Sequence, residues 1–145
     1  MELAISALRL HDYHISKKRI TVQTRTAESA VASVKRGEIF QVLTNLLLNA
    51  IEALPHSGNL HVRVAMRHPN AVITIADNGK GIPDGLRETL FEPFKSDKSE
   101  GNGLGLWIAR EIVHRHGGMI RYQSRSIPGR SGTIFRVTLP IQAAA

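Results

Sequence analysis

The segment from Gly37 to Leu54, GEIFQVLTNLLLNAIEAL, most restricts the folds available to this chain. At about 100° per residue, its polar side chains form a stripe roughly 80° wide, and nearly all other positions are apolar. A helix with so narrow a polar face must be buried on most sides, and its stripe must meet water or a ligand in a cleft. An ordinary solvated helix edge is the alternative. The stripe consists of Glu38, Gln41, Asn45, Asn49 and Glu52.

Alternating apolar and polar residues predict five strands beside this helix, at 19–25, 60–67, 71–77, 119–125 and 133–140. Further helices are expected at 1–16 and 104–116, with a short one within 84–91. Two pairs of sequential strands are joined by turns, which favours antiparallel pairing. The sequence therefore predicts an α/β two-layer sandwich: about five strands in a mixed, largely antiparallel sheet, with three main helices on one face.

The composition is that of one soluble domain: 145 residues, 42% hydrophobic and 21% charged. No apolar run approaches the roughly 20 residues that cross a bilayer, and the N-terminal residues do not resemble a signal peptide. We therefore expect no direct membrane insertion. The absence of cysteine fits a reducing, cytoplasmic location.

The net charge is +7, yet the basic residues are scattered along the chain, with a single run at Lys17-Lys18-Arg19, and aromatic residues make up only 5%. We therefore expect no nucleic acid partner. A basic domain that binds a polyanionic small molecule would carry the same charge.

The strand at 71–77 ends in an aspartate, followed by two spaced glycines in DNGKGIP. By period two, Ile73, Ile75 and Asp77 share one face, so the carboxylate continues an apolar surface and needs a donor. A carboxylate only accepts hydrogen bonds, so it suits the exocyclic amine of adenine and repels the carbonyl of guanine. Gly79 and Gly81 would let a flat group approach. The alternative is a common Asp-Asn-Gly turn.

Glycines alternate at Gly101, Gly103 and Gly105, directly before the helix at 104–116. Exposed N–H groups and the helix dipole would make this start an anion site, whereas a flexible hinge is the alternative. The preceding KSDKSE, with Lys95 and Lys98, predicts a mobile lid that carries cations toward phosphates. Neither a P-loop nor a dinucleotide fingerprint is present.

Asn45 and Asn49 lie one turn apart on the polar stripe. An asparagine carbonyl can ligate a hard cation such as Mg²⁺, and its amide can donate to phosphate. Two aspartates would bind the metal but repel the phosphate.

The order of these motifs resembles that of the catalytic ATP-binding domain of bacterial sensor histidine kinases, over roughly residues 37–140. That domain belongs to the ATPase superfamily shared with type II topoisomerases, MutL and a heat-shock chaperone. The resemblance implies a Bergerat-type ATP-binding fold with ATP and Mg²⁺ as cofactors. NLLLNAIEAL is similar to the N box, DNGKGIP to the first glycine box, LFEPF to the F box and GNGLGL to the second glycine box.

The resemblance also implies residue roles. Asn49 is implied as the Mg²⁺ ligand, Asn45 lies beside the phosphates, and Asp77 recognises adenine. Thr133 matches a threonine that backs the adenine pocket through water. The other implied nucleotide contacts are the pocket wall at Gly79, Gly81 and Ile82, the lid anchors Phe91 and Phe94, and the phosphate-facing Gly101, Gly103, Leu104, Gly105 and Leu106.

Two departures from the family pattern affect the phosphate end of the site. Glu52 stands where many members carry a lysine, which leaves Lys95 and Lys98 as the cations expected at the phosphates. The short lid favours the nitrogen- and oxygen-sensing branch of the family. Asn45, Asn49 and Lys98 are then the expected catalytic residues, acting by positioning and charge neutralisation.

We expect residues 1–17 to be a helical stub that leads from a dimerisation and phosphoacceptor domain, and residues 18–145 to be the catalytic domain. His11-Asp12 begins like a phosphoacceptor motif but lacks its proline, so all seven histidines are expected to be structural or solvated. The implied partners are a histidine on a separate dimerisation domain and the receiver domain of a response regulator.

Two other functions remain open. A serine kinase of the anti-sigma-factor type would use the same pocket, and a nucleotide-gated interaction module would bind ATP without transferring phosphate. A gyrase-like ATPase is the least favoured function, because those relatives carry a glutamate base where this chain has Asn45.

Overall fold

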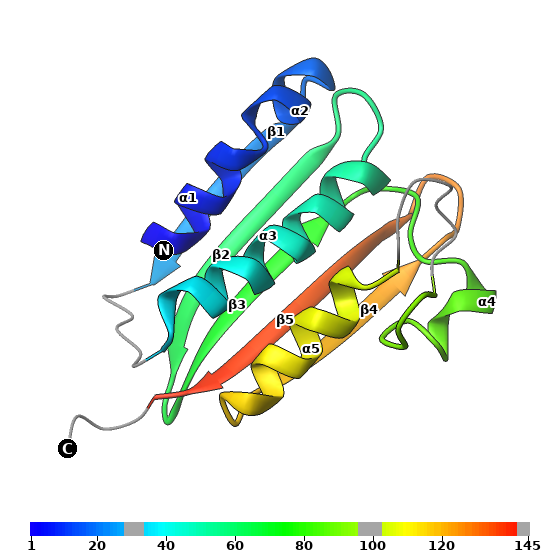
Figure 1. The fold of residues 1–145 in the computed structure, drawn as a ribbon. Coiled ribbons are helices and arrows are strands. Elements are labelled where there is room, and N and C mark those ends of the chain that lie inside the picture. The colour runs from blue at the N-terminus through cyan, green and yellow to red at the C-terminus, as the bar shows by residue number, and fades with distance from the viewer. Residues whose placement is uncertain (28–33, 96–102, 142–145) are drawn as a thin grey trace.

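The computed structural model describes residues 1–27, 34–95 and 103–141. A five-stranded sheet forms one layer and the helices form the other (Figure 1). The helices are α1 (Glu2–Leu10), α2 (Asp12–Lys17), α3 (Arg36–Ala53), α4 (Asp84–Arg87) and α5 (Gly105–Arg115). The strands are β1 (Thr21–Ala27), β2 (Asn59–Arg67), β3 (Asn70–Asp77), β4 (Met119–Arg125) and β5 (Gly132–Pro140).

The strand order is β1-β2-β3-β5-β4, and only β1 pairs in parallel, with β2. The predicted mixed, largely antiparallel sheet is confirmed. The hairpins β2–β3 and β4–β5 follow from their short turns, but the contact between β3 and β5 joins strands far apart in the chain. That long-range pairing sets Asp77 opposite Thr133, so two of the predicted site residues lie side by side.

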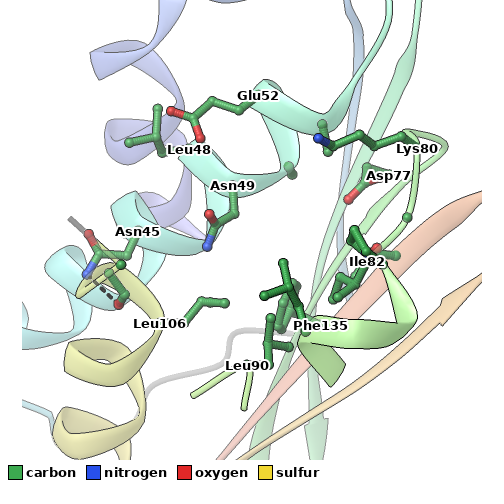
Figure 2. Close-up of a pocket in the computed structure, with 18 of the residues that line it drawn as sticks. Asn45, Leu48, Asn49, Glu52, Asp77, Lys80, Ile82, Leu90, Leu106 and Phe135 are labelled. Atoms are coloured by element: carbon green, nitrogen blue, oxygen red, sulfur yellow. Dashed lines mark hydrogen bonds between the residues drawn. The ribbon is translucent and has the colours of Figure 1, made fainter. Parts of the chain in front are cut away.

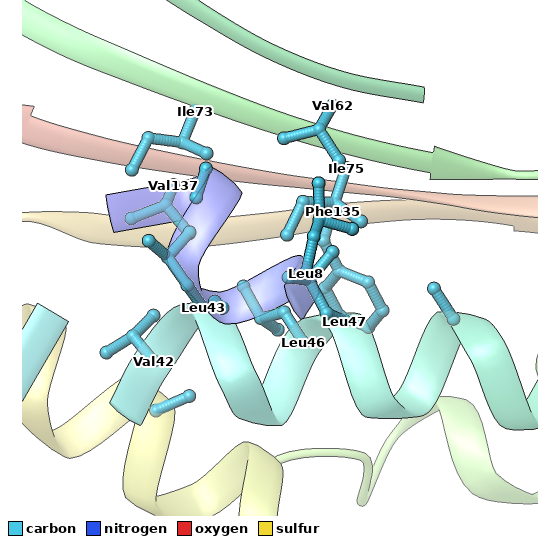
Figure 3. Close-up of a cluster of buried hydrophobic side chains, with 14 of the residues drawn as sticks. Leu8, Val42, Leu43, Leu46, Leu47, Val62, Ile73, Ile75, Phe135 and Val137 are labelled. Carbon is cyan, nitrogen blue, oxygen red and sulfur yellow. The ribbon is translucent and has the colours of Figure 1, made fainter. Parts of the chain in front are cut away.

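Helices α1, α3 and α5 all cover the same face of the sheet (Figure 1). The central α3 buries Leu43, Leu46 and Leu47 to 1% exposure or less, against Ile75 and Phe135 of the sheet (Figure 3). Truncating one such leucine to alanine costs about 2–5 kcal/mol in comparable cores. The narrow polar stripe thus follows from the burial of α3 between the sheet and two flanking helices.

The predicted single helix over 1–16 is wrong in one respect, because it is interrupted at His11. The His11 N–H donates to the Leu8 carbonyl (2.9 Å), three residues back, which tightens the turn and separates α1 from α2. The His11 side chain is buried, and this burial lowers its pKa, although a hydrogen bond with the Thr44 backbone opposes the shift. His11 is therefore structural here, as expected.

The first helix packs onto the domain through Ala4, Ala7 and Leu8. That these residues lead from a phosphoacceptor domain stays a prediction. Within the described residues, no helix combines the length and apolarity needed to span a bilayer.

Lys18 stabilises the C-terminal end of α3. Its Nζ donates to the carbonyls of Ile51 (2.8 Å), Glu52 (3.2 Å) and Leu54 (2.9 Å). These carbonyls lack partners within the helix, and a cation also complements the negative end of the helix dipole. The α2–β1 connection thereby fixes the end of the helix that carries both asparagines.

Candidate functional site

A cavity of about 270 Å³ opens between α3, the segment after β3 and the start of α5 (Figure 2). Its apolar floor includes Ile82, Leu90, Leu106 and Phe135. Polar side chains lie at its base and along its edge, as expected for a small-molecule site. They are Asn45, Asn49, Glu52, Asp77, Lys80, Lys95 and Thr133. We call the region around Asp77 the closed end and the region between Asn45 and Lys95 the open end.

Asp77 forms the base of the closed end and is only 9% exposed. Its Oδ1 accepts the Gly79 N–H (2.8 Å), and its register partner on β5 is Thr133. Burial raises the pKa of Asp77 to about 6, although the backbone N–H groups of Gly79 and Thr133 oppose the shift. A carboxylate desolvated in this way gains from any donor that a ligand brings.

A hydroxyl network continues from Thr133 to β4. Thr133 Oγ1 lies 2.9 Å from Ser124 Oγ, which also accepts the Ile82 N–H (2.8 Å). Because the register pairs Asp77 with Thr133 and Thr133 with Ser124, these three side chains lie in one row across β3, β5 and β4. The row holds the segment after β3 against the sheet and keeps the closed end in shape.

Two glycines of the DNGKGIP motif are required by the packing of the protein itself. A Cβ at Gly79 would lie 2.5 Å from the Ala53 carbonyl oxygen, and the Lys80 N–H donates to that same oxygen (3.1 Å). Gly81 has φ +78, and a Cβ there would lie 2.2 Å from the Arg125 carbonyl oxygen. These glycines therefore let the end of α3 and the end of β4 approach the loop, an explanation that the sequence does not provide.

The open end is built around the first turn of α5. Asn45 Nδ2 donates to the Gly105 carbonyl (3.0 Å), which ties the stripe of α3 to the start of α5 (Figure 2). Asn49 points into the cavity beside it. Lys95 and Gly103 complete the lining at this end. The arrangement places the Asn49 side chain, the Lys95 ammonium and the first turn of α5 around one space, which suits an anionic ligand.

The structure brings most of the predicted site residues to this cavity. Those that line it are Asn45, Asn49, Asp77, Gly81, Ile82, Lys95, Gly103, Gly105, Leu106 and Thr133. Gly79 lies behind Asp77, and Leu104 is the N-cap of α5. Lys98 and Gly101 lie outside the described residues.

The two phenylalanines of the LFEPF segment differ sharply. Phe91 packs edge-on against Tyr122 and Phe135, with the Arg110 guanidinium 5.6 Å from its ring centroid. Phe94 is 75% exposed, with φ 63. Phe91 thus anchors this segment to the sheet in the present structure, whereas Phe94 lies on the surface.

Sequence reasoning missed Ser124 and Lys80. Ser124 follows Ile120 and Tyr122 on the inward face of β4, so a polar residue that continues an apolar face was the available signal, as it was for Asp77. Lys80 also lines the cavity (Figure 2). It stands between Gly79 and Gly81, and its position in the loop gave no periodic signal of the direction of its side chain.

Residues 34–143 match the family described as histidine kinase-, DNA gyrase B-, and HSP90-like ATPase. Among curated proteins, the C4-dicarboxylate transport sensor protein DctB of Rhizobium meliloti (strain 1021) is 48% identical over 101 residues, which cover 68% of this chain and 16% of that protein. Sporulation kinase D of Bacillus subtilis (strain 168) is 32% identical over 125 residues, covering 86% of this chain and 24% of that kinase. The chain therefore spans only a small part of each relative.

A solved structure of the nucleotide-free catalytic domain of histidine kinase ThkA superposes with a TM-score of 0.85 and 32% identity, covering 97% of this chain and 91% of that one. The agreement extends over both layers of the sandwich, so the fold and the motif order point to the same family. The chain belongs to the histidine kinase-, DNA gyrase B- and HSP90-like ATPases, as a catalytic ATP-binding domain of the sensor histidine kinase type.

Proposed function

We propose that this domain binds ATP with Mg²⁺ in the cavity and presents the γ-phosphate to a histidine on a separate dimerisation domain. The observation that carries the proposal is Asp77, a buried carboxylate fixed by the Gly79 N–H at the base of a cavity lined by all the nucleotide-box segments described. Its free lone pairs accept the exocyclic amine of adenine, and Thr133 and Ile82 lie against the ring.

At the open end, the phosphates lie against Gly103, Gly105 and the start of α5, with Leu104 and Leu106 framing them. Asn45 and Lys95 neutralise their charge, and Lys98 and Gly101 are proposed to join them. Asn49 supplies a carbonyl ligand to Mg²⁺. Among the described residues, no three His, Asp or Glu side chains form a metal site of their own. A single carbonyl ligand from Asn49 fits Mg²⁺, which commonly binds through one or two protein ligands and the substrate phosphates.

The protein contributes little covalent chemistry to this transfer. Its residues hold the phosphate chain in one orientation and neutralise charge, so that the acceptor nitrogen attacks in line. Asn45, Asn49 and Lys98 carry that role. The only carboxylates on the polar stripe are Glu38 and Glu52, and neither is assigned as a general base, so we expect slow hydrolysis without a partner.

Relatives support the signalling context. One solved structure holds histidine kinase ThkA in complex with response regulator protein TrrA, and it matches this chain with 29% identity and a TM-score of 0.80. We infer a receiver domain as the downstream partner and a cytoplasmic location, and the parent protein can be membrane-anchored. The sensor kinases among the relatives favour phosphohistidine chemistry over the serine kinase and over the nucleotide-gated module.

Calorimetric titration of ATP·Mg²⁺ tests the binding site. Asp77→Asn is expected to weaken ATP binding roughly 10- to 100-fold, because a hydrogen bond to a charged group is lost. Asp84→Asn, which removes an exposed carboxylate outside the cavity, is the matched control. GTP should bind poorly to the unmodified domain and to Asp84→Asn, because both keep the carboxylate that repels the guanine carbonyl. Failure of the unmodified domain to bind ATP, or equal affinity of both variants, would overturn the proposal.

The chemistry of transfer needs a second test, with labelled ATP and a separately produced phosphoacceptor domain. Phosphohistidine is labile in acid and stable in base, whereas phosphoserine has the opposite stability in these conditions. An acid-stable product would favour the anti-sigma-factor type of kinase.

A further inference from the structure

The register of the sheet aligns arginines that are far apart in the sequence. Arg25 on β1 pairs with Arg63 on β2, which is opposite Thr74 on β3. Thr74 is opposite Arg136 on β5, which pairs with Arg121 on β4. One line of residues thus crosses all five strands and contains four arginines, which we call the arginine row. At about 4.8 Å between strands, the row is about 19 Å long.

The arginine row lies on the face of the sheet that the helices leave open. Residues one position away along the strands, such as Val62, Ile75 and Phe135, are buried beneath α3, whereas the four arginines are exposed. Figure 1 shows α1, α3 and α5 on the opposite side of the sheet. The same open face also carries the exposed side chains of His61, Arg67 and Arg125.

This positive charge is not balanced by neighbouring groups of the described chain. No ion pair joins an arginine of the row to another described residue. Asp77 is the only acidic residue on the described strands, and it faces the helices. Like charges on neighbouring strands repel, so Arg25 beside Arg63 and Arg136 beside Arg121 destabilise the free sheet. An anionic partner would relieve that repulsion.

The kind of side chain indicates the kind of partner. Every Lys or Arg on the described strands is an arginine, and arginine, unlike lysine, is enriched at protein interfaces and grips carboxylates with a planar fork. A lipid surface would accept lysine equally well. The strand aromatics Tyr122 and Phe135 face the helices, so His61 carries the only ring that the described strands place on the open face, and one imidazole is a poor platform for stacking successive bases. Met119 and Ile134 add exposed apolar area to this face.

We propose that the open face of the sheet docks an acidic protein surface, with carboxylates set against the arginine row. The occupant is a strand or helix about 20 Å long that presents several Asp or Glu side chains. This interaction is separate from the ATP cavity on the helical side, and it does not depend on the proposed function.

Fluorescence anisotropy with a labelled 20-residue polyglutamate, in about 0.15 M salt, tests this surface. The test variant is Arg63→Gln with Arg136→Gln, and the matched control is Arg9→Gln with Arg115→Gln, which removes the same charge from exposed helix positions. Vesicles containing phosphatidylserine and a 20-base-pair duplex DNA are the alternative probes. Circular dichroism checks that every variant is folded.

We expect the row variant to bind polyglutamate at least roughly tenfold more weakly and the control to retain its affinity. Equal loss in both variants would overturn the proposal, because net charge alone would then explain binding. Absence of polyglutamate binding would also overturn it. So would binding to vesicles or DNA that depends on the row while polyglutamate binds independently of it.

Discussion

The two ends of the cavity are built in different ways. At the closed end, Asp77 is buried, accepts a backbone N–H and lies in a hydroxyl row with Thr133 and Ser124. At the open end, the side-chain hydrogen bond from Asn45 to Gly105 holds two helices together, and Lys95 is exposed. The closed end is therefore part of the buried core, whereas the open end lies at the surface and is joined to the core by this side-chain hydrogen bond. Substitutions at the closed end should affect stability as well as affinity for the base, whereas those at the open end should mainly affect affinity for the phosphates.

Gly81→Ala should give the largest effect. A Cβ there would lie 2.2 Å from the Arg125 carbonyl oxygen, and φ is +78. The steric overlap and the backbone strain would therefore both destabilise the folded state. We expect a loss of about 3 kcal/mol in the free energy of unfolding, measured with urea. Gly85→Ala is the control, since a Cβ there meets nothing within 4 Å. Equal stability of the two variants would remove the distinction between the ends.

The charge of Asp77 should make the stability of the closed end depend on pH. Its folded pKa of about 6 exceeds the ordinary 3.8, so the folded state holds the proton more tightly. The stabilisation is complete below about pH 4 and is lost as pH rises through about 6, by about 3 kcal/mol in total. We therefore expect the free energy of unfolding of Asp77→Asn to rise relative to that of the unmodified protein between pH 4 and pH 8, measured with urea. A constant difference across that range would contradict this prediction.

Lys18→Met should weaken the support of α3 at the closed end. The ammonium donates to three carbonyls at the helix end, so its removal should cost about 1–2 kcal/mol in thermal or urea unfolding. Lys17→Met is the matched control, because Lys17 is exposed and its Nζ lies over the Tyr13 ring, 5.8 Å from the ring centroid. A similar loss in both variants would show that overall charge matters and that the cap does not.

Gly105→Ala should have the smallest effect on stability and should test whether the open end binds the phosphates. A new Cβ would lie 3.8 Å from the nearest Asn45 side-chain atom, an ordinary contact, and alanine suits the start of a helix. We expect a gain of about 0.5 kcal/mol in stability. Affinity for ATP should fall while affinity for adenosine stays the same, measured by calorimetry. Equal weakening of both ligands would place the effect at the closed end instead.

Much of this molecule could be predicted from local patterns. The stripe of α3, the period-two strands and the spacing of the glycines each report the direction of side chains within a few residues, so they indicate helices, strands and the family. The interruption at His11 was missed, because nothing in an amphipathic repeat shows where a helix tightens. Ser124 was missed because its role depends on the Ile82 N–H after β3, which reaches β4 only through the long-range pairing of β3 with β5.

The sequence by itself determined the two-layer sandwich, the burial of α3 and most of the polar residues that line the cavity, although not Lys80. Only the tertiary structure decided why Gly79 and Gly81 are glycines, since the groups that approach them come from Ala53 and Arg125. It also gathered the scattered arginines into one row. The physical reason is strand register. A periodic pattern shows which face of a strand a residue occupies, but the residue opposite it on the neighbouring strand depends on packing between segments that are far apart in the chain.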